Sequence, residues 1–383
     1  MARIGIDTAP ISQHRGRGVG ALAGQLLAAL LAARGGHSFL LFAPAGRAVG
    51  GWAGGAGAEA RVRPAVRPGF SPAWLMDALR LDRQVRAARP GLFHAFFQWN
   101  LPLRRLPVPV VGHVYDLMPL AVEEIYLRRF RIPVGRKIKL YGAYLRHALR
   151  RVDRVITISE HTKRDLVRRM GFPPERVHAV PPGPAPGMGP LPDPSRLDAL
   201  RERLGLAGGY LLYTGGFDHR KNVEVLLRAH ARARARGLEL PLVLAGGMGS
   251  PYGQRIQALA AAAPGVMLPG FVPDGDLPAL YAGAGLVLYP SLYEGFGLPV
   301  LDAMACGAPV ACSDHPSLDE AAGEAALRLP AEDESAWAEA MIRAAGAEAL
   351  AGPRRRGLLH ARSFSWERAA QGILATYHAI LGM

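Results

Sequence analysis

The sequence predicts an α/β protein with two doubly wound, Rossmann-like domains that face each other across a cleft. Half of the 383 residues are hydrophobic and a fifth are charged, which is typical of a globular chain with two or three domains. Short apolar runs alternate with helical patterns along the chain, which favours βαβ units and parallel sheets covered on both faces. Residues 181–195 hold seven prolines and three glycines, so this stretch is predicted to link the two domains.

Nine apolar runs are expected as strands. Before the linker they are residues 3–7, 38–42, 91–95, 108–114 and 154–159, and after it residues 210–214, 242–245, 286–289 and 309–313. Helices are expected between them, for example at residues 21–33, 223–235 and 277–284. Ligands of open α/β sheets bind beyond the carboxyl ends of the strands, so the turns that follow strands are the candidate sites.

Several protein classes are excluded by the composition. A disordered chain, a collagen and a small disulfide scaffold do not fit this hydrophobic content and length. No apolar stretch of about 18 residues is uninterrupted, and the first seven residues are expected to form a strand rather than a signal peptide. Cys306 and Cys312 lie too close in sequence to link two domains and fit a reducing compartment, so a cytoplasmic protein is expected.

The net charge of +15 is unevenly distributed. Residues 1–180 hold 29 Lys and Arg against 11 Asp and Glu, whereas residues 181–383 hold 17 against 20. Residues 128–154 alone contain ten basic residues and one acid, interleaved with apolar side chains. A basic half beside a nearly neutral half indicates an anionic partner for one part of the molecule, and an arginine-rich solvated surface is the alternative.

Glycine-rich turns follow the expected strands. Gly18 and Gly20 belong to a run, Gly-Arg-Gly-Val-Gly, that precedes the apolar helix 21–33. Its spacing departs from the dinucleotide fingerprint, but the free amides of the helix could still face an anion. Gly215 and Gly216 follow the strand at 210–214, where they let the backbone approach a ligand closely.

Adjacent cations follow the same strand. Arg220 and Lys221 precede the helix that starts near Val223, and such a pair can clamp a diphosphate, Arg through its planar fork and Lys as a point charge. Asn222 is expected to cap that helix.

Two carboxylates lie seven residues apart after the strand 286–289. Glu294 lies in the loop and Asp302 on the helix that Pro299 begins. Gly295 and Gly297 leave amides free beside the helix N-terminus, where an anion can bind. Carboxylates accept hydrogen bonds from sugar and ribose hydroxyls, while the amides and the Arg-Lys pair suit a diphosphate. Together these groups indicate a nucleotide-sugar site.

Residues 289–310, YPSLYEGFGLPVLDAMACGAPV, resemble the donor-site signature of the retaining glycosyltransferases of family 4, which have the GT-B fold. That signature has a second Glu where this chain has Asp302. The resemblance covers nearly the whole chain: residues 215–222 are similar to the diphosphate loop of the family, residues 270–277 to its base-binding loop, and residues 313–323 and 364–381 also fit.

The resemblance implies roles for these residues. Arg220 and Lys221 would neutralise the leaving diphosphate, Glu294 would bind hydroxyls of the transferred sugar, and Asp302 would bind the ribose. The other residues assigned to donor binding are Gly18, Gly20, Gly215, Gly216, Gly295, Phe296, Gly297 and Leu298, with Val272 and Leu277 flanking the base. The family is thought to use front-side attack, in which the leaving phosphate takes the proton of the acceptor and no protein nucleophile is needed.

The N-terminal half resembles a subgroup rich in mannosyltransferases through Asp116 and the four residues after it, DLMPL. Many members carry His directly before this Asp, where the chain has Tyr115. His113, two places earlier, and His94 on the acceptor side are therefore both candidates for a catalytic histidine, and the choice stays open.

Asp274-Gly275-Asp276 has the D-x-D shape that binds metal in other glycosyltransferases. Its position directly before Leu277 favours a helix-capping turn, so we expect no catalytic metal and no other cofactor.

The resemblance implies domains at residues 1–182 and 183–363, with residues 364–383 forming a helix that packs back on the first domain. The expected function is retaining transfer of a hexose, foremost mannose from GDP-mannose, to a glycan or lipid-linked acceptor in bacterial cell-surface polysaccharide synthesis. Residues 128–154 would dock the protein on the anionic inner face of a membrane. The alternatives are a UDP-sugar donor, a GT-B epimerase, and a basic nucleic-acid-binding protein; nucleic acid is not the expected partner.

Overall fold

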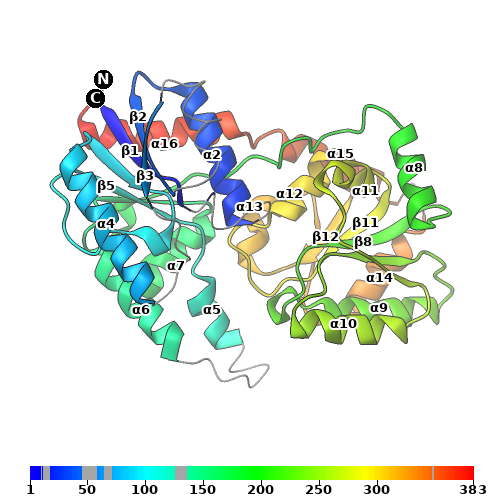
Figure 1. The fold of residues 1–383 in the computed structure, drawn as a ribbon. Coiled ribbons are helices and arrows are strands. Elements are labelled where there is room, and N and C mark those ends of the chain that lie inside the picture. The colour runs from blue at the N-terminus through cyan, green and yellow to red at the C-terminus, as the bar shows by residue number, and fades with distance from the viewer. Residues whose placement is uncertain (10, 12–17, 45–57, 64–70, 126–135, 347–348) are drawn as a thin grey trace. The chain divides into compact units, whose positions relative to one another are not determined.

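The computed structural model describes residues 1–9, 11, 18–44, 58–63, 71–125, 136–346 and 349–383. The chain forms two compact units. Unit 1 contains Met1–Gly183 and Ser365–Met383, and unit 2 contains Pro184–Phe364 (Figure 1). The chain therefore passes from one unit to the other twice. The domain ranges expected from the sequence differ from this division by one residue at each crossing.

Unit 1 is built on a parallel sheet with the strand order β3-β2-β1-β4-β5-β6-β7. Its strands are β1 (Arg3–Asp7), β2 (Ser38–Pro44), β3 (Ala58–Arg63), β4 (Leu92–Ala95), β5 (Val110–Val114), β6 (Arg154–Thr157) and β7 (Val177–Ala179). Its α-helices are α2 (Val19–Ala33), α4 (Pro72–Ala88), α5 (Met118–Ile125), α6 (Arg136–Leu149), α7 (Glu160–Met170) and α16 (Trp366–Leu381). The direction of the strand order reverses between β1 and β4, so a switch point lies there.

The two faces of the unit 1 sheet are covered by different helices (Figure 1). Side chains of α4, α6 and α7 form one continuous core with the strands, and aromatic rings contribute to it: the rings of Trp74 and Tyr144 lie 5.2 Å apart. On the other face α2 packs against the terminal helix α16. Tyr377 of α16 is fully buried and its hydroxyl lies 2.7 Å from Nδ1 of His94 on β4.

Unit 2 is built on a second parallel sheet, with the order β10-β9-β8-β11-β12-β13. Its strands are β8 (Tyr210–Thr214), β9 (Leu242–Ala245), β10 (Val266–Gly270), β11 (Ala284–Tyr289), β12 (Val310–Ser313) and β13 (Leu327–Leu329). Its α-helices are α8 (Ser195–Leu204), α9 (Val223–Arg234), α10 (Pro251–Ala261), α11 (Leu277–Ala282), α12 (Leu298–Ala305), α13 (Asp319–Ala322), α14 (Glu334–Arg343) and α15 (Ala351–Ala361). Here the strand order reverses between β8 and β11.

The α/β class and the two doubly wound, parallel-sheet units confirm the fold class predicted from the sequence. All nine expected strands are present: β1, β8 and β9 have the expected bounds, and in the other six one end is shifted by one or two residues. Four further strands, β3, β7, β10 and β13, were not expected, and they are the edge strands of the two sheets. The helix expected to run to residue 284 ends at Ala282, because Ala284 already pairs with Tyr210 of β8.

The structure bears on the cysteines and on the search for a membrane-spanning helix. Cys306 and Cys312 are both free and buried. Among the residues that the structure describes, no helix is both long enough and apolar enough to cross a membrane.

Candidate active site

Two loops meet at the switch point of unit 2. The first follows β8 and contains a short 3₁₀ helix, η4 (His219–Lys221), and the second follows β11 and runs into α12. The amide of Leu292 donates to the carbonyl of Arg220 at 2.7 Å, and the side-chain amide of Asn222 donates to the carbonyls of Pro290 and Ala331. The two loops are therefore fixed to each other by a backbone hydrogen bond and by the side chain of Asn222.

The expected capping role of Asn222 is wrong. Asn222 directly precedes α9 but adopts a left-handed conformation, with φ of 53°, and its side chain makes no capping hydrogen bond to the helix. The left-handed backbone directs the side-chain amide of Asn222 toward the second loop instead of toward the free N–H groups of α9. Asn222 therefore connects the loops rather than starting the helix.

A buried ion cluster lies where the loops meet. Glu294 accepts from Lys221 Nζ at 2.5 Å through one carboxylate oxygen and from Arg220 Nη1 at 2.9 Å through the other. Arg220 also donates to the carbonyl of Tyr293, and its backbone amide donates to Asp218. All three charged side chains of the cluster are at least four-fifths buried. One carboxylate thus holds two cations side by side, and such a pair can clamp a diphosphate.

Tyr289, the last residue of β11, completes the cluster. Its hydroxyl accepts a hydrogen bond from Lys221 Nζ at 2.6 Å, and the Lys221 ammonium lies 4.9 Å from the centre of its ring. Tyr289 is not among the residues expected at the site from the sequence. Its position at the carboxyl end of a strand next to the switch point is the signal that could have found it.

Electrostatics keep Glu294 ionised. Burial raises its pKa, but the facing charges of Arg220 and Lys221 outweigh that effect and lower the pKa to about 2. For Lys221, burial and the neighbouring charge of Arg220 lower the pKa, and the bond to Glu294 opposes this. The cations therefore keep Glu294 charged, and Glu294 in turn favours the charged form of Lys221.

The loop amides expected to bind an anion lie directly before α12. Gly297 is the N-cap residue and has φ of 100°, and a Cβ atom there would meet Leu318 at 2.5 Å, so both backbone and space require glycine. No side chain caps the helix at Gly297, and the amide of Val300 donates to the carbonyl of Gly297 at 2.9 Å. The amide of Glu294 donates to the Ser317 hydroxyl, which fixes the start of this loop.

Asp302 lies on α12 and is 8 % exposed. Its carboxylate accepts a hydrogen bond from the backbone amide of Ala185 at 2.8 Å, so it holds the chain just after the first crossing. Burial raises the pKa of Asp302 to about 7, and the Ala185 amide opposes the shift. No hydrogen bond or ion pair among the described residues joins Asp302 to Glu294 or to the two cations. The two carboxylates of the signature therefore occupy separate environments.

The glycines after β8 and β9 bring the two strand ends together. The carbonyl of Gly215 lies 1.9 Å from the position that a Cβ atom of Gly246 would take, so only glycine fits there.

In the segment that follows β10, Phe271 is 62 % exposed, Val272 is buried, and Leu277 is the first residue of α11. The segment expected to flank a base thus follows β10, on the edge of the sheet beyond β9.

The D-x-D segment forms a 3₁₀ turn, η5 (Asp274–Asp276), directly before α11, as expected, but the N-cap residue Asp276 makes no side-chain capping hydrogen bond. Asp276 has helical backbone angles and its carboxylate pairs with Arg203 at 2.6 Å. Within the described ranges, no group of three His, Cys, Asp or Glu side chains is arranged to hold a metal ion.

His94 and His113 lie inside unit 1. Their rings stack with centroids 5.6 Å apart, and neither side chain is exposed. Burial lowers the pKa of both, that of His113 to about 3, and the ring nitrogens of His113 have no hydrogen-bond partner in the described part of the chain. A general base must reach the proton that it accepts, and both imidazoles are enclosed within unit 1 in this arrangement. Their catalytic assignment stays a prediction.

Asp116 differs from the histidines because it is half-buried. Its carboxylate accepts from the amide of Met118 at 3.0 Å, at the start of α5, and its carbonyl accepts from the Gln98 side chain.

Gly18 and Gly20 lie at the start of α2, with φ of 68° at Gly18, whereas the preceding residues 12–17 lie outside the described residues.

Sequence reasoning also missed a polar pair at the switch point of unit 1. Asp7 ends β1 and is fully buried, and its carboxylate accepts a hydrogen bond from the Asn100 side chain at 2.5 Å and another from the amide of Ala9. Asn100 follows β4, so the pair joins the two loops that flank the switch point. An Asp at the end of the first strand is the only sequence signal for it.

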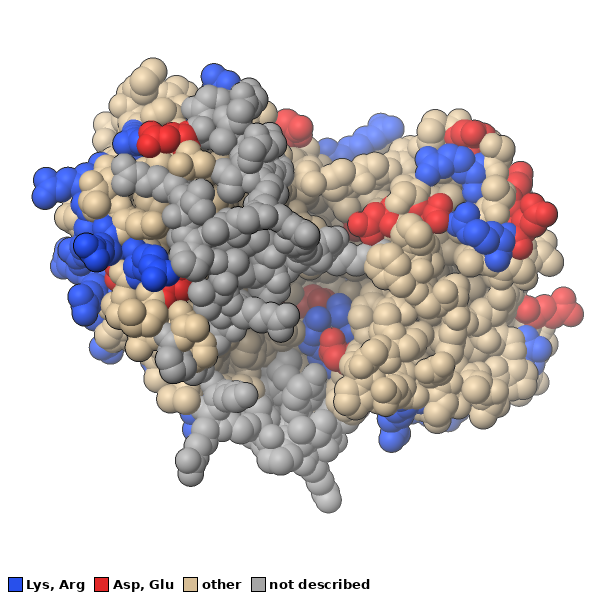
Figure 2. Space-filling view, in the orientation of Figure 1, with Lys and Arg blue, Asp and Glu red and all other residues tan. Residues whose placement is uncertain are grey.

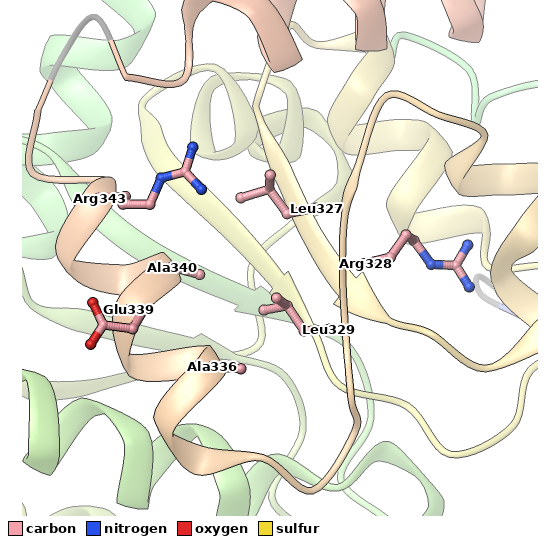
Figure 3. A pocket seen from close by; sticks show the side chains of 7 residues that line it. All are labelled: Leu327, Arg328, Leu329, Ala336, Glu339, Ala340 and Arg343. Carbon is pink, nitrogen blue, oxygen red and sulfur yellow. The ribbon is translucent and has the colours of Figure 1, made fainter.

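A surface hollow of about 370 Å³ lies elsewhere in unit 2, between β13 and α14 (Figure 3). It is lined by Leu327, Arg328, Leu329, Ala336, Glu339, Ala340 and Arg343. None of the predicted site residues belongs to it.

Two doubly wound units built on parallel sheets are the architecture of the GT-B glycosyltransferases, and comparison with known proteins places the chain in that class. Residues 16–184 match the family model described as Glycosyltransferase Family 4, and residues 208–346 match the model described as Glycosyl transferases group 1. The chain is 34% identical over 341 residues to a D-inositol 3-phosphate glycosyltransferase of Salinispora tropica, covering 81% of this chain and 68% of that protein. The chain belongs to glycosyltransferase family 4, which confirms the resemblance found in the sequence.

Other known proteins are similar over different spans. The O-antigen chain mannosyltransferase B of Escherichia coli is 31% identical over 245 residues, which cover 63% of this chain and 64% of that protein. Among solved structures, sucrose-phosphate synthase of Thermosynechococcus elongatus aligns over the full length of both chains, with a TM-score of 0.76 and 20% identity. Anabaena HepE in complex with UDP and glucose aligns over 99% of this chain and 100% of its own, with a TM-score of 0.73 and 18% identity. At these identities the two structures support the fold.

Proposed function

We propose that this glycosyltransferase moves a hexose from a nucleotide-sugar donor to a glycan or lipid-linked acceptor, with retention of configuration, in cell-surface polysaccharide synthesis. The observation that carries the proposal is the buried cluster of Arg220, Lys221 and Glu294 at the switch point of unit 2. A transferase needs positive charge where the diphosphate leaves, and an acceptor of hydrogen bonds where the sugar lies. This cluster supplies both within one site.

In the proposed reaction, Arg220 and Lys221 neutralise the negative charge that develops on the leaving diphosphate. The amides of residues 295–298 add hydrogen-bond donors at the start of α12, and Glu294 accepts from hydroxyls of the transferred sugar. Asp302 binds the ribose through the oxygen that Ala185 does not use. These groups act by holding the donor in one geometry and by stabilising the leaving group.

The proposed transfer uses no protein nucleophile and no metal. The acceptor hydroxyl attacks the anomeric carbon on the side that the diphosphate leaves, and the leaving phosphate oxygen takes the hydroxyl proton. Two fixed cations take the place that a metal ion would have beside the diphosphate. The burial of His94 and His113 supports a route in which no imidazole accepts the proton.

For the donor we propose GDP-mannose. The support is the likeness to a protein named O-antigen chain mannosyltransferase B, together with the DLMPL segment at Asp116. That relative also supports a polysaccharide or lipid-linked acceptor, and such an acceptor would place the enzyme in the cytoplasm, at the inner surface of the membrane. A UDP-sugar is the alternative donor within the same fold.

The test is a donor panel. The protein is incubated with GDP-mannose, GDP-fucose, UDP-glucose, UDP-galactose and UDP-N-acetylglucosamine, and the nucleoside diphosphate released is measured with and without a polyprenyl-diphosphate-linked sugar. We expect GDP from GDP-mannose, stimulated by the acceptor, and an α-linked product by NMR. Release of UDP alone would move the proposal to a UDP-sugar. Release of free sugar at an unchanged rate with every acceptor would favour an epimerase or hydrolase. No release from any donor would overturn the proposal.

A further inference from the structure

The turn after β12 supports the loop that carries Glu294. This turn is a short 3₁₀ helix, η6 (Pro316–Leu318), and its N-cap residue is His315. Leu318 is fully buried, and a Cβ atom on Gly297 would meet it at 2.5 Å, so η6 lies directly against the start of α12. The position of the Glu294 loop therefore depends on a second segment, which follows β12.

A chain of hydrogen bonds runs from Glu294 to His315. The amide of Glu294 donates to the Ser317 hydroxyl at 2.9 Å, and that hydroxyl lies 2.8 Å from Nδ1 of His315. The backbone amide of Ser317 also donates to Nδ1, at 3.2 Å. The rings of His315 and Tyr293 lie edge to face with centroids 5.9 Å apart, so His315 also packs against the residue directly before Glu294.

The backbone donor decides which nitrogen of the His315 ring carries the proton. An N–H group can only donate, so Nδ1 accepts from Ser317 and the proton of the neutral ring lies on Nε2. The Ser317 hydroxyl must then donate to Nδ1, and its oxygen is left to accept from Glu294. A proton on Nδ1 would instead deprive the N–H of Ser317 of this acceptor. Each bond of the chain thus orients the next one.

Arg328 on β13 anchors the far end of the chain. Its guanidinium donates to the carbonyl of His315 at 3.0 Å and pairs with Asp319 at 2.9 Å. Surface ion pairs are common on unit 2, and Figure 2 shows blue and red side chains next to each other over α8, so this pair alone indicates no function. The bond to the His315 carbonyl is distinctive, because it fixes the residue whose ring holds Ser317.

Different partners hold the side chain and the backbone of Glu294. Its carboxylate is held by Arg220 and Lys221, from the loop after β8, whereas its amide depends on Ser317. Loss of the amide bond would therefore release the backbone of residues 294–298 while the two cations keep their carboxylate. In the proposed reaction this backbone contacts the donor, and a displacement of about 1 Å can slow a reaction about 100-fold.

We propose that His315 is a positioning residue for Glu294. Through Nδ1 it holds the Ser317 hydroxyl in the orientation that accepts the Glu294 amide, and so it keeps residues 294–298 in the geometry that transfer requires. His315 acts through Ser317 rather than on the reacting atoms. The inference rests on the proposed function only for its effect on transfer, since its effect on the Glu294 amide follows from the hydrogen bonds.

The first measurement is hydrogen exchange of the Glu294 amide by NMR, which needs no substrate. His315→Leu removes the acceptor and should speed exchange about three- to tenfold, and Ser317→Ala, which removes the hydroxyl, should speed it further. His315→Asn should restore slow exchange, because the side-chain oxygen of Asn can accept from the amide two residues later, as Nδ1 does. His230→Leu is the matched control, because His230 also bonds to a backbone carbonyl of unit 2, that of Leu240 at 3.0 Å, but lies on α9 outside this chain of bonds.

The second measurement is turnover of the donor. The kcat of His315→Leu should fall about tenfold, and that of His315→Asn should stay within about threefold of the unchanged protein. Affinity for the nucleoside diphosphate product should change less than about fivefold in both, because Arg220 and Lys221 remain in place. A purely structural role predicts a lower melting temperature with unchanged kcat, which is the result expected for His230→Leu.

The results that overturn the proposal are distinct from those that overturn the proposed function. The proposal is wrong if exchange of the Glu294 amide is unchanged in both His315→Leu and Ser317→Ala, or if His315→Asn is as impaired as His315→Leu. A kcat of His315→Leu within about twofold of the unchanged protein would also overturn it. Faster exchange in a chain that releases no nucleoside diphosphate from any donor would contradict the proposed function alone.

Discussion

Glu294→Gln is the substitution that examines the ion cluster most directly. Gln keeps the shape of the side chain and removes its charge, so Arg220 and Lys221 would lose the carboxylate that they share in a buried site, and only Arg220 would keep a carboxylate, that of Asp218 at 3.4 Å. Their charges lower the pKa of Glu294 from 4.5 to about 2 against the effect of burial. A shift of this size corresponds to roughly 3 kcal/mol of folding free energy, in the range of about 3–5 kcal/mol for breaking a buried ion pair.

The pH dependence of this contribution has a definite sign. A carboxylate with a depressed pKa stabilises the folded state fully above its unfolded pKa of about 4.5, and the contribution is lost as the pH falls toward about 2. The gap in stability between the unchanged protein and Glu294→Gln should therefore be full at pH 7 and shrink below about pH 4.5.

Thermal unfolding and turnover provide the two readouts. For a unit of this size, 3 kcal/mol lowers the melting temperature of unit 2 by roughly 6–12 °C. Glu334→Gln is the matched control, because Glu334 also pairs with two arginines but at the surface, and its loss should cost less than about 1 kcal/mol. Donor turnover by folded Glu294→Gln should fall by at least about 100-fold. Equal melting temperatures for Glu294→Gln and Glu334→Gln, or turnover within a few-fold of the unchanged protein, would refute the reasoning.

The remaining predictions concern other parts of the two units. Arg220→Ala and Lys221→Ala should each weaken binding of the nucleoside diphosphate product about 10- to 100-fold by calorimetry, because a charge-assisted bond is lost; unchanged affinity in both would place the diphosphate elsewhere. Asp302→Asn should become more stable relative to the unchanged protein as the pH rises from about 4 to 8, because burial raises the pKa of Asp302 to about 7 and its charged form destabilises the fold; a constant difference in melting temperature across that range would contradict this. Tyr377→Phe should cost about 1–3 kcal/mol in chemical denaturation, because it leaves His94 buried without its partner, and a cost below about 0.5 kcal/mol would show that the bond contributes little. Transfer activity should survive treatment with EDTA, and a loss that manganese restores would revive a metal site.

The internal strands of both sheets could be predicted from the sequence because they are buried on both faces. A strand such as β8, at residues 210–214, is a continuous apolar run, and all five of its residues are buried. The edge strands lack this signal. β10 and β13 are only half-buried throughout, and β13 has Arg328 at its centre, so no apolar run marks them. Their pairing depends on a neighbour that is distant in sequence, which local patterning does not report.

The charged residues of the site could be predicted because their chemistry requires particular side chains near strand ends. Sequence spacing placed Arg220, Lys221 and Glu294 in loops that follow β8 and β11, and the structure joins them. The partners of neutral residues could not be predicted in this way. The role of Asn222 depends on one left-handed backbone angle, and that of Tyr289 on the loop that lies over it. The bond between Asp302 and Ala185 links residues 117 positions apart, which spacing alone cannot anticipate.

The burial of the histidines bears on where the acceptor proton goes in the proposed reaction. Burial lowers the pKa of His113 to about 3 and encloses its ring, which favours a route in which His113 does not take the proton of a sugar hydroxyl. Tyr115, at the position where many relatives of the subgroup carry His, is also fully buried, and its hydroxyl lacks a hydrogen-bond partner among the described residues. In the proposed reaction, the leaving phosphate is therefore the base. The negative charge of the diphosphate must be neutralised enough for it to leave the sugar, and its oxygen must stay basic enough to take the proton. Arg220 and Lys221 set that balance, since both reach the site from one short turn after β8 and are held by one carboxylate.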